Sequence, residues 1–144
     1  MTTNRMFSKE IEKLKVAGLR VTKQRIAVAN IIFENKNHHF TAESLYKESL
    51  KKNCRLSMAT IYNTLRNFTE ANLLREVFID SDRRYYDTNL TDHHHLYFSD
   101  SGHLEDVQSN QIQISKFPDI PQGLKIDRMD MIIRVSKKLG KTST

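Results

Sequence analysis

The hydrophobic pattern of this chain changes period once, near residue 72, and that change limits the folds it can adopt. Up to residue 71, apolar residues recur three or four positions apart, which is typical of helices with one buried face. The pattern predicts helices over residues 6–17, 23–35, 42–52 and 58–71, the last three capped by Thr22, Thr41 and Ser57. From residue 74 onwards it predicts a strand hairpin, residues 74–79 and 84–87. Three helices followed by a hairpin is the order of a winged helix-turn-helix, and we expect that fold here.

The remainder of the chain predicts a second, smaller domain built on strands. Its predicted elements are strands over residues 94–99, 103–107 and 124–135 and a short helix over residues 109–116. The fold class is therefore α+β. We expect a winged helix-turn-helix domain over residues 1–87, a polar hinge over residues 88–92, and a small α/β domain over residues 93–144.

Charge is distributed unevenly between these two parts. Residues 1–84 contain 16 Lys and Arg against 9 Asp and Glu, a net charge of +7, whereas residues 85–144 contain 7 against 8, a net charge of −1. A basic first part is typical of a protein that binds a polyanion such as DNA. It equally fits a surface that only aids solubility, so charge alone does not separate the two interpretations.

Cysteine content and the length of apolar runs indicate the cellular compartment of the protein. Cys54 is the one cysteine, so no disulfide can form within the chain and no Cys-x-x-Cys zinc site exists. The N-terminal residues lack the apolar core of a signal peptide, and no apolar run is long enough to span a membrane. We therefore expect a cytoplasmic protein without a membrane partner.

The predicted helix over residues 58–71 separates its residues by face. Ile61, Leu65 and Phe68 form the apolar face, which leaves a polar face open. The first residues of a recognition helix contact base edges in the major groove, while basic and hydroxyl side chains hold phosphates. The hairpin and the charge favour this interpretation over an ordinary solvated helix face. The candidate DNA-binding residues are Arg20, Thr22, Arg25, Ser57, Ala59, Thr60, Tyr62, Asn63 and Arg66, with Lys23, Arg83 and Arg84 as further candidates for backbone contacts.

Three of the six histidines are consecutive, at positions 93–95. On a strand, His93 and His95 point to one side and His94 to the other. A His-x-His pair is a compact set of two ligands for a divalent metal, although a polar strand entry without any ligand has the same appearance. Glu105 and Asp106 are expected on the neighbouring strand near the histidines, and neither is predicted as a ligand.

Four segments together resemble the ferric uptake regulator family in order and spacing. They are AGLRVTKQRIAVANIIF, NHHFTAESLYKESL, SMATIYNTLRNFTEANLL and HHHLYFSDSG, and the resemblance covers residues 16–135. It implies an N-terminal winged helix, a hinge and a C-terminal α/β dimerisation domain, acting as a homodimer on a two-fold-related DNA operator. In the family a basic residue like Arg20 reaches the minor groove, and a tyrosine like Tyr62 contacts bases.

The resemblance also implies a ligand set at an inter-domain regulatory site, namely His39, Asp87, His93 and His95. The two cysteines that usually form the family's structural zinc site are replaced here by Phe98 and Ser101. The positions of a further metal site are Asp92, His94, Gln113 and Met129, and Gln and Met are poor ligands for hard divalent ions. The resemblance therefore predicts one regulatory site and no cysteine zinc site.

Because it lacks the cysteine pair and has a histidine triplet, the chain is most similar to one branch of the family, the iron response regulators of bacteria. That resemblance implies control of iron and haem genes through haem bound at His93, His94 and His95, with His38 or His39 contributing. Some members carry a Cys-Pro haem motif, whereas Cys54 here precedes Arg55. The alternative is a sensor of Fe²⁺ or Mn²⁺ without haem. A small metal-dependent enzyme is a remote alternative, because the chain has no HExxH, Gly-rich phosphate loop or Ser/His/Asp arrangement, and we expect no enzyme.

Overall fold

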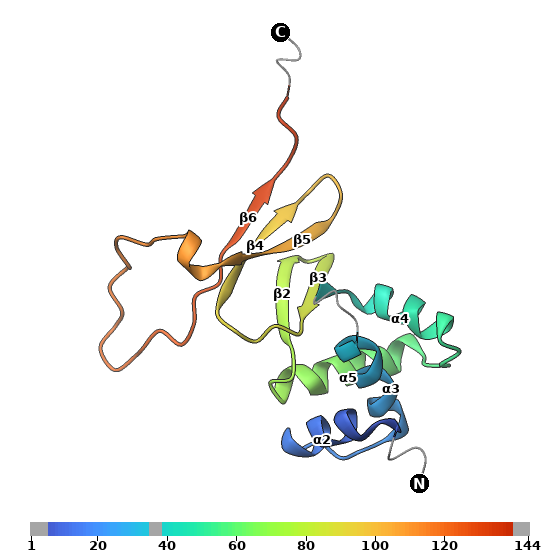
Figure 1. Cartoon of the computed structure of the whole chain (residues 1–144). Helices are drawn as coiled ribbons and strands as arrows, with labels where there is room; N and C mark the ends of the chain where they lie inside the picture. The colour runs from blue at the N-terminus through green and yellow to red at the C-terminus, as the bar shows by residue number, and fades with distance from the viewer. Residues whose placement is uncertain (1–5, 35–38, 140–144) are drawn as a thin grey trace. The chain divides into compact units, whose positions relative to one another are not determined.

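The chain forms two compact units, Met1–Leu90 and Thr91–Thr144, which are called the N-terminal and C-terminal units below. The computed structural model describes residues 6–34 and 39–139. His38, named above as a haem candidate, lies outside the described residues. Figure 1 draws the N-terminal unit in blue to green and the C-terminal unit in yellow to red.

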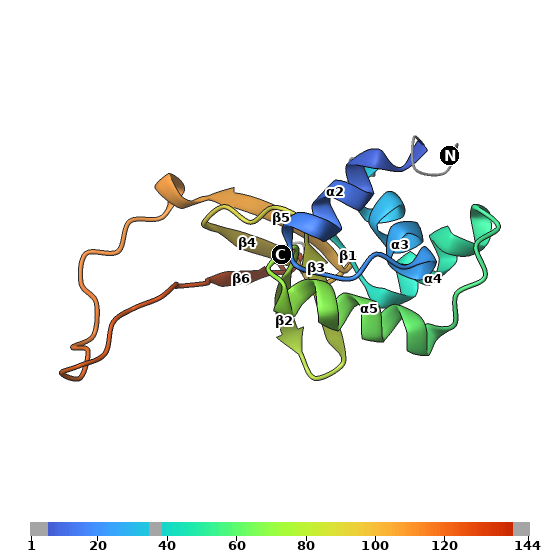
Figure 2. The same cartoon turned by 90° about the horizontal axis from the view of Figure 1, so that it is seen from below.

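Over the residues that the structure describes, the N-terminal unit contains four helices and a small sheet. The helices are α2 (Ser8–Val16), α3 (Lys23–Glu34), α4 (Ala42–Lys51) and α5 (Met58–Glu70). The strands are β1 (His39–Phe40), β2 (Arg75–Asp80) and β3 (Arg83–Asp87), in the antiparallel order β1-β3-β2. Figure 2 shows α5 leading directly into the β2–β3 hairpin. This order of helices followed by a hairpin confirms the predicted sequence of elements.

The starts of three helices are set by local side chains, as the sequence predicts. The Thr22 hydroxyl accepts a hydrogen bond from the backbone N–H of Arg25 at 3.2 Å. Thr41 and Ser44 form a reciprocal capping box, and the Ser57 hydroxyl accepts from the N–H of Thr60 at 3.0 Å. Each cap satisfies a backbone donor that has no partner inside its helix.

One apolar core holds the N-terminal unit together, and α5 lies at its centre. The inward face of α5 places Ile61, Leu65 and Phe68 at 0% exposure, as predicted. Side chains from all four helices and from the sheet complete this core, namely Leu14, Val28, Ala29, Ile31, Ile32, Ala42, Leu45, Leu74 and Tyr86. Packing of one face of α5 into this core fixes which of its residues point outwards.

The C-terminal unit is a three-stranded sheet with a long connection. Its strands are β4 (His93–Phe98), β5 (His103–Gln108) and β6 (Ile132–Val135), in the order β5-β4-β6. β4 pairs antiparallel with β5 and parallel with β6. Gly102, with φ 77°, lies in the turn between β4 and β5, a backbone region that favours glycine.

Two predicted elements of the C-terminal unit are shorter in the structure. The strand predicted over residues 124–135 is reduced to Ile132–Val135, because only these residues pair with β4. The helix predicted over residues 109–116 is a 3-10 turn, Ser109–Gln111, in which Gln111 Oε1 accepts from the backbone N–H of Gln108 at 2.9 Å, and it ends at the extended residue Ile112. Between them the chain forms an open connection without regular structure, drawn in orange in Figure 1.

Candidate nucleic-acid interface and metal-ligand clusters

The outward face of α5 carries most of the predicted DNA-binding residues. Tyr62 is 49% exposed, and Ala59, Asn63 and Arg66 are also exposed. Ser57 and Thr60 differ, because they form the cap of the helix and their hydroxyls hydrogen-bond each other at 2.9 Å. The face therefore presents a phenol, an amide and a guanidinium over about two helical turns, the groups that read or hold DNA.

All three of these side chains are held by hydrogen bonds before any ligand binds. The Tyr62 hydroxyl donates to Glu43 Oε2 at 2.9 Å, from α5 to the first turn of α4. This hydrogen bond to Glu43 is the main cause that raises the pKa of Tyr62 above its ordinary value, so the phenol keeps its proton. The next residue, Asn63, accepts a hydrogen bond at its Oδ1 from the Arg66 guanidinium at 2.6 Å.

Of the basic residues before and within α3, Arg25 is hydrogen-bonded to the backbone, and Arg20 and Lys23 have exposed side chains. The Arg25 guanidinium donates to the backbone carbonyl of Arg20 at 2.7 Å, and Thr22 serves as the cap of α3. Arg20 and Lys23 are exposed. Arg20 is thus presented to solvent with its backbone held by Arg25, whereas Thr22 and Arg25 have local structural roles in addition to any contact with DNA.

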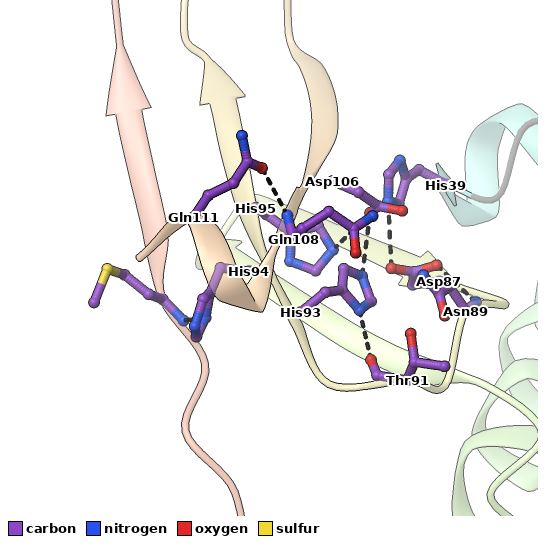
Figure 3. A network of polar contacts seen from close by, with 11 residues as sticks. His39, Asp87, Asn89, Thr91, His93, His94, His95, Asp106, Gln108 and Gln111 are labelled. Atoms are coloured by element: carbon purple, nitrogen blue, oxygen red, sulfur yellow. Dashed lines mark hydrogen bonds and ion pairs between the residues drawn. The ribbon is translucent and has the colours of Figure 1, made fainter. Parts of the chain in front are cut away.

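In the N-terminal unit, His39 and Asp87 form a close pair. They lie opposite each other on β1 and β3, with His39 Nε2 at 3.3 Å from Asp87 Oδ2 (Figure 3). Asp87 is fully buried, and its other oxygen accepts from the backbone N–H of Asn89 at 2.8 Å. A buried carboxylate needs such partners, because burial of an unpaired charge is costly. A two-residue strand leaves no hydrophobic period, which is why the sequence predicted no strand at the position of β1.

In the C-terminal unit, two histidines converge on one carboxylate. His93 Nε2 lies 3.1 Å and His95 Nε2 lies 3.5 Å from Asp106 Oδ1. Each of these three residues offers a ligand atom within 4.8 Å of the others. The separations fit neighbouring ligands of one ion, which lie about 3 Å apart when metal–ligand bonds are about 2.1 Å. The arrangement therefore suits a divalent cation without a large rearrangement.

Hydrogen bonding around His93 directs its Nε2 atom towards the Asp106 carboxylate. Its Nδ1 lies 2.6 Å from the carbonyl oxygen of Thr91, which can only accept, so Nδ1 carries the proton. The lone pair of a neutral ring is then on Nε2 and faces the Asp106 carboxylate. Two acceptors at this distance repel unless a proton or a metal ion lies between them. A partner that fixes the ring from its far side is usual for metal-binding histidines.

His94 is placed apart from its two neighbours. It points away from His93 and His95 (Figure 3), and its Nδ1 accepts a hydrogen bond from the backbone N–H of Met131 at 3.2 Å. The structure therefore does not bring all three histidines of the predicted metal or haem set together. His94 instead tethers the chain just before β6, because alternate side chains of a strand point to opposite faces.

Asp106 is the site residue that the sequence did not predict as a ligand. It lies directly opposite His95 in the antiparallel register of β4 and β5, so both side chains lie on one face. The length of the connection between β4 and β5 determines this register, because residues 99–102 join the pair Phe98 and His103. Counting outwards from that pair matches position 106 with position 95.

Comparison with known proteins agrees with this fold. The pattern of the ferric uptake regulator family matches residues 16–134. The chain is 30% identical over 109 residues to the ferric uptake regulation protein of Haemophilus influenzae, covering 75% of each. The ferric uptake regulator of Pseudomonas aeruginosa, solved with manganese, shares 22% identity at a TM-score of 0.72, covering 90% of this chain and 98% of that one. The regulator of Francisella tularensis, solved with iron, shares 19% at 0.68, covering 84% and 93%.

The chain therefore belongs to the ferric uptake regulator family, whose members are metal-responsive transcription regulators and not enzymes. It has the α+β fold of that family, with an N-terminal helix-turn-helix and a C-terminal unit built on a sheet. Within residues 6–34 and 39–139, no helix has the length and apolar character needed to cross a membrane.

Proposed function

We propose that this protein is a cytoplasmic regulator that binds operator DNA as a homodimer and responds to Fe²⁺ or Mn²⁺. One observation carries the proposal: His93, His95 and Asp106 place two imidazoles and one carboxylate around a common point. Imidazole and carboxylate ligands together suit divalent first-row metals. The ion would act as a Lewis-acidic centre that these residues hold, and no chemical step is required of it.

We further propose that His39 and Asp87 contribute to the same ion, as the family resemblance implies. Support comes from the N-terminal unit itself, where Asp87 is fully buried and already oriented by Asn89. An ion bound by both units would restrict the hinge between them. It would thereby favour one arrangement of the two α5 helices of a dimer. DNA affinity would rise by at most the factor by which the ion binds that arrangement more tightly than the others.

The DNA-binding part of the proposal rests on α5 and on the basic residues of the N-terminal unit. α5 presents Tyr62, Asn63 and Arg66 outwards from a fully packed core. Arg20 and the hairpin residues Arg83 and Arg84 are exposed and suit contacts with phosphates. Replacement of Arg20 by Ala should weaken binding to all sequences alike, whereas replacement of Tyr62 should act on sequence preference.

The proposed effector is tested by the matched variants Asp106→Asn and His103→Ala. His103 is an exposed histidine of β5, so its removal controls for histidine content. Mn²⁺ binding is measured by calorimetry on the full chain, and binding to operator fragments by fluorescence anisotropy with and without Mn²⁺. We expect Asp106→Asn to lower Mn²⁺ affinity about 10- to 100-fold and to remove the metal response of DNA binding. Equal Mn²⁺ affinity in the wild type and in Asp106→Asn would contradict the proposal.

Haem remains the competing effector implied by the likeness to the iron response regulators. The structure supports an ion more directly, because His94 is turned away from the other two histidines and Tyr97 is only 1% exposed and cannot stack on a porphyrin. An absorbance titration with haem separates the two effectors. A saturable Soret shift that is lost when His93, His94 and His95 are all replaced by Ala, and kept in His103→Ala, would establish haem in place of the ion.

A further inference from the structure

One hydrogen bond joins the exposed face of α5 to a neighbouring helix. The Tyr62 hydroxyl donates its proton to Glu43 Oε2 at 2.9 Å, because an ionised carboxylate can only accept. Glu43 lies in the first turn of α4, two residues after the Thr41 cap, where the helix dipole stabilises a negative charge. Both side chains are exposed, so this pair lies on the surface that α5 presents.

The bond decides what the Tyr62 hydroxyl can offer to a second partner. With its single proton committed to Glu43, the oxygen retains only lone pairs. Thymine O4, guanine O6 and N7, and phosphate oxygens are all acceptors and would meet those lone pairs unfavourably. The N6 amino group of adenine and the N4 amino group of cytosine are donors in the major groove and can bond to the hydroxyl.

Charge acts in the same direction. The Glu43 carboxylate lies beside the hydroxyl and repels phosphates, so it disfavours placing Tyr62 against the DNA backbone. The neighbouring residue, Asn63, offers donors instead of an acceptor. The Arg66 guanidinium has only donors and binds the Oδ1 atom of Asn63, so the amide N–H groups of Asn63 are left to donate. The face of α5 thus presents an acceptor at Tyr62 and donors at Asn63 and Arg66.

We propose that Glu43 is a specificity-determining positioning residue, which fixes the Tyr62 hydroxyl as an acceptor and so selects a base with an exocyclic amino group. The inference rests on the proposed binding of DNA through α5. The pKa of Tyr62, raised chiefly by this same bond, keeps the hydroxyl protonated and the pair intact. A single hydrogen bond of ordinary strength gives a preference of about 3- to 10-fold for adenine or cytosine.

The test is a selection from a duplex DNA library with a random central segment, using the full chain with Mn²⁺. Four variants are compared with the wild type, namely Tyr62→Phe, Glu43→Ala, Glu43→Gln and Glu48→Ala. Glu48 lies on the same helix and pairs with Lys51 at 3.7 Å, so Glu48→Ala removes the same charge without touching Tyr62. The position read by Tyr62 is the one whose base distribution changes in Tyr62→Phe.

At that position we expect adenine or cytosine in the wild type. In Glu43→Ala the preference for these two bases should fall below about 2-fold, because the Tyr62 hydroxyl is then free to donate as readily as it accepts. Glu43→Gln keeps an acceptor for the hydroxyl, so it should retain the preference while binding all sequences more tightly. Glu48→Ala should match the wild type.

Three results would overturn the inference. An unchanged distribution in Glu43→Ala, with selection by the wild type intact, would remove the role of Glu43 and leave the proposed function standing. Thymine or guanine at the position read by Tyr62 would contradict the acceptor assignment. No enrichment by the wild type would remove the proposed DNA binding and this inference with it.

Discussion

The two units of the protein differ in how much of their own apolar surface they bury. In the N-terminal unit, four helices and a sheet enclose a shared core in which Leu14, Leu65 and Phe68 are fully buried. In the C-terminal unit, the buried apolar side chains of the described residues are Tyr97 and Leu104. Several large apolar side chains of that unit are exposed instead, namely Phe117, Ile120, Leu124, Ile126, Ile133 and Leu139.

This difference indicates that the two units have different roles. A unit with a complete core presents a rigid helix face, which suits recognition of a fixed partner such as a DNA groove. A unit that leaves its apolar residues exposed needs a second surface to cover them, and patches of this kind mark interaction sites. We therefore expect the stability of the C-terminal unit to depend on its ion and on a second copy of the chain, and that of the N-terminal unit to be intrinsic.

The largest expected effect is loss of the N-terminal core. Leu65→Ala removes a fully buried side chain from α5 and should lower the free energy of unfolding of this unit by about 2–5 kcal/mol, because it leaves a cavity. Chemical denaturation followed by circular dichroism measures the change. Arg66→Ala, one position further along on the exposed face, should shift stability by less than about 0.5 kcal/mol. Equal losses in both variants would contradict an intrinsic core.

The next largest expected effect is a difference between the two units in the loss of hydrogen-exchange protection when the ion is removed. Hydrogen exchange is measured with Mn²⁺ at about 100 times its dissociation constant and then after chelation. Linkage gives a loss of about 2.7 kcal/mol in the protection of β4 and β5 amides, because the ion binds the folded unit. Amides in the core-facing turns of α5 should change far less. A uniform change across both units would contradict the difference between them.

A charge placed on the exposed apolar connection should act on assembly. Leu124 is 67% exposed, and Leu124→Glu should weaken the proposed dimer about 10- to 100-fold, because the carboxylate would be buried without a partner. Val16→Glu places the same charge on a 78% exposed apolar residue of the N-terminal unit and should leave the dimer intact. Sedimentation equilibrium over a range of concentrations reads both variants. An unchanged dimer in Leu124→Glu would mean that the connection lies outside the interface.

The smallest expected effect is alkaline sensitivity of the N-terminal unit. Burial raises the pKa of Tyr86 above its ordinary value of about 10. Below that value the phenol is protonated in both the folded and the unfolded chain, so its contribution to stability is fully present. As pH rises further, the unfolded chain ionises first and stability is lost. Tyr86→Phe should flatten this alkaline loss in thermal unfolding curves, and an identical pH profile would contradict it.

Much of the N-terminal unit was predictable because its signals are local. Thr22, Thr41 and Ser57 cap helices through bonds to residues three positions away, and the buried face of α5 follows from helical spacing. The candidate site was predictable only in part. His93 and His95 were recognised because they are two apart on one strand, whereas β1 and the short extent of β6 depend on strands far away in the sequence.

The sequence by itself determined the order of the elements, the caps and the family, because these depend on residue type and short spacing. Only the tertiary structure decided that Asp106 faces His93 and His95, that His94 turns to Met131, and that Glu43 holds the Tyr62 hydroxyl. Those contacts join residues 11 to 37 positions apart. Strand register and helix packing set them, and no local pattern encodes either.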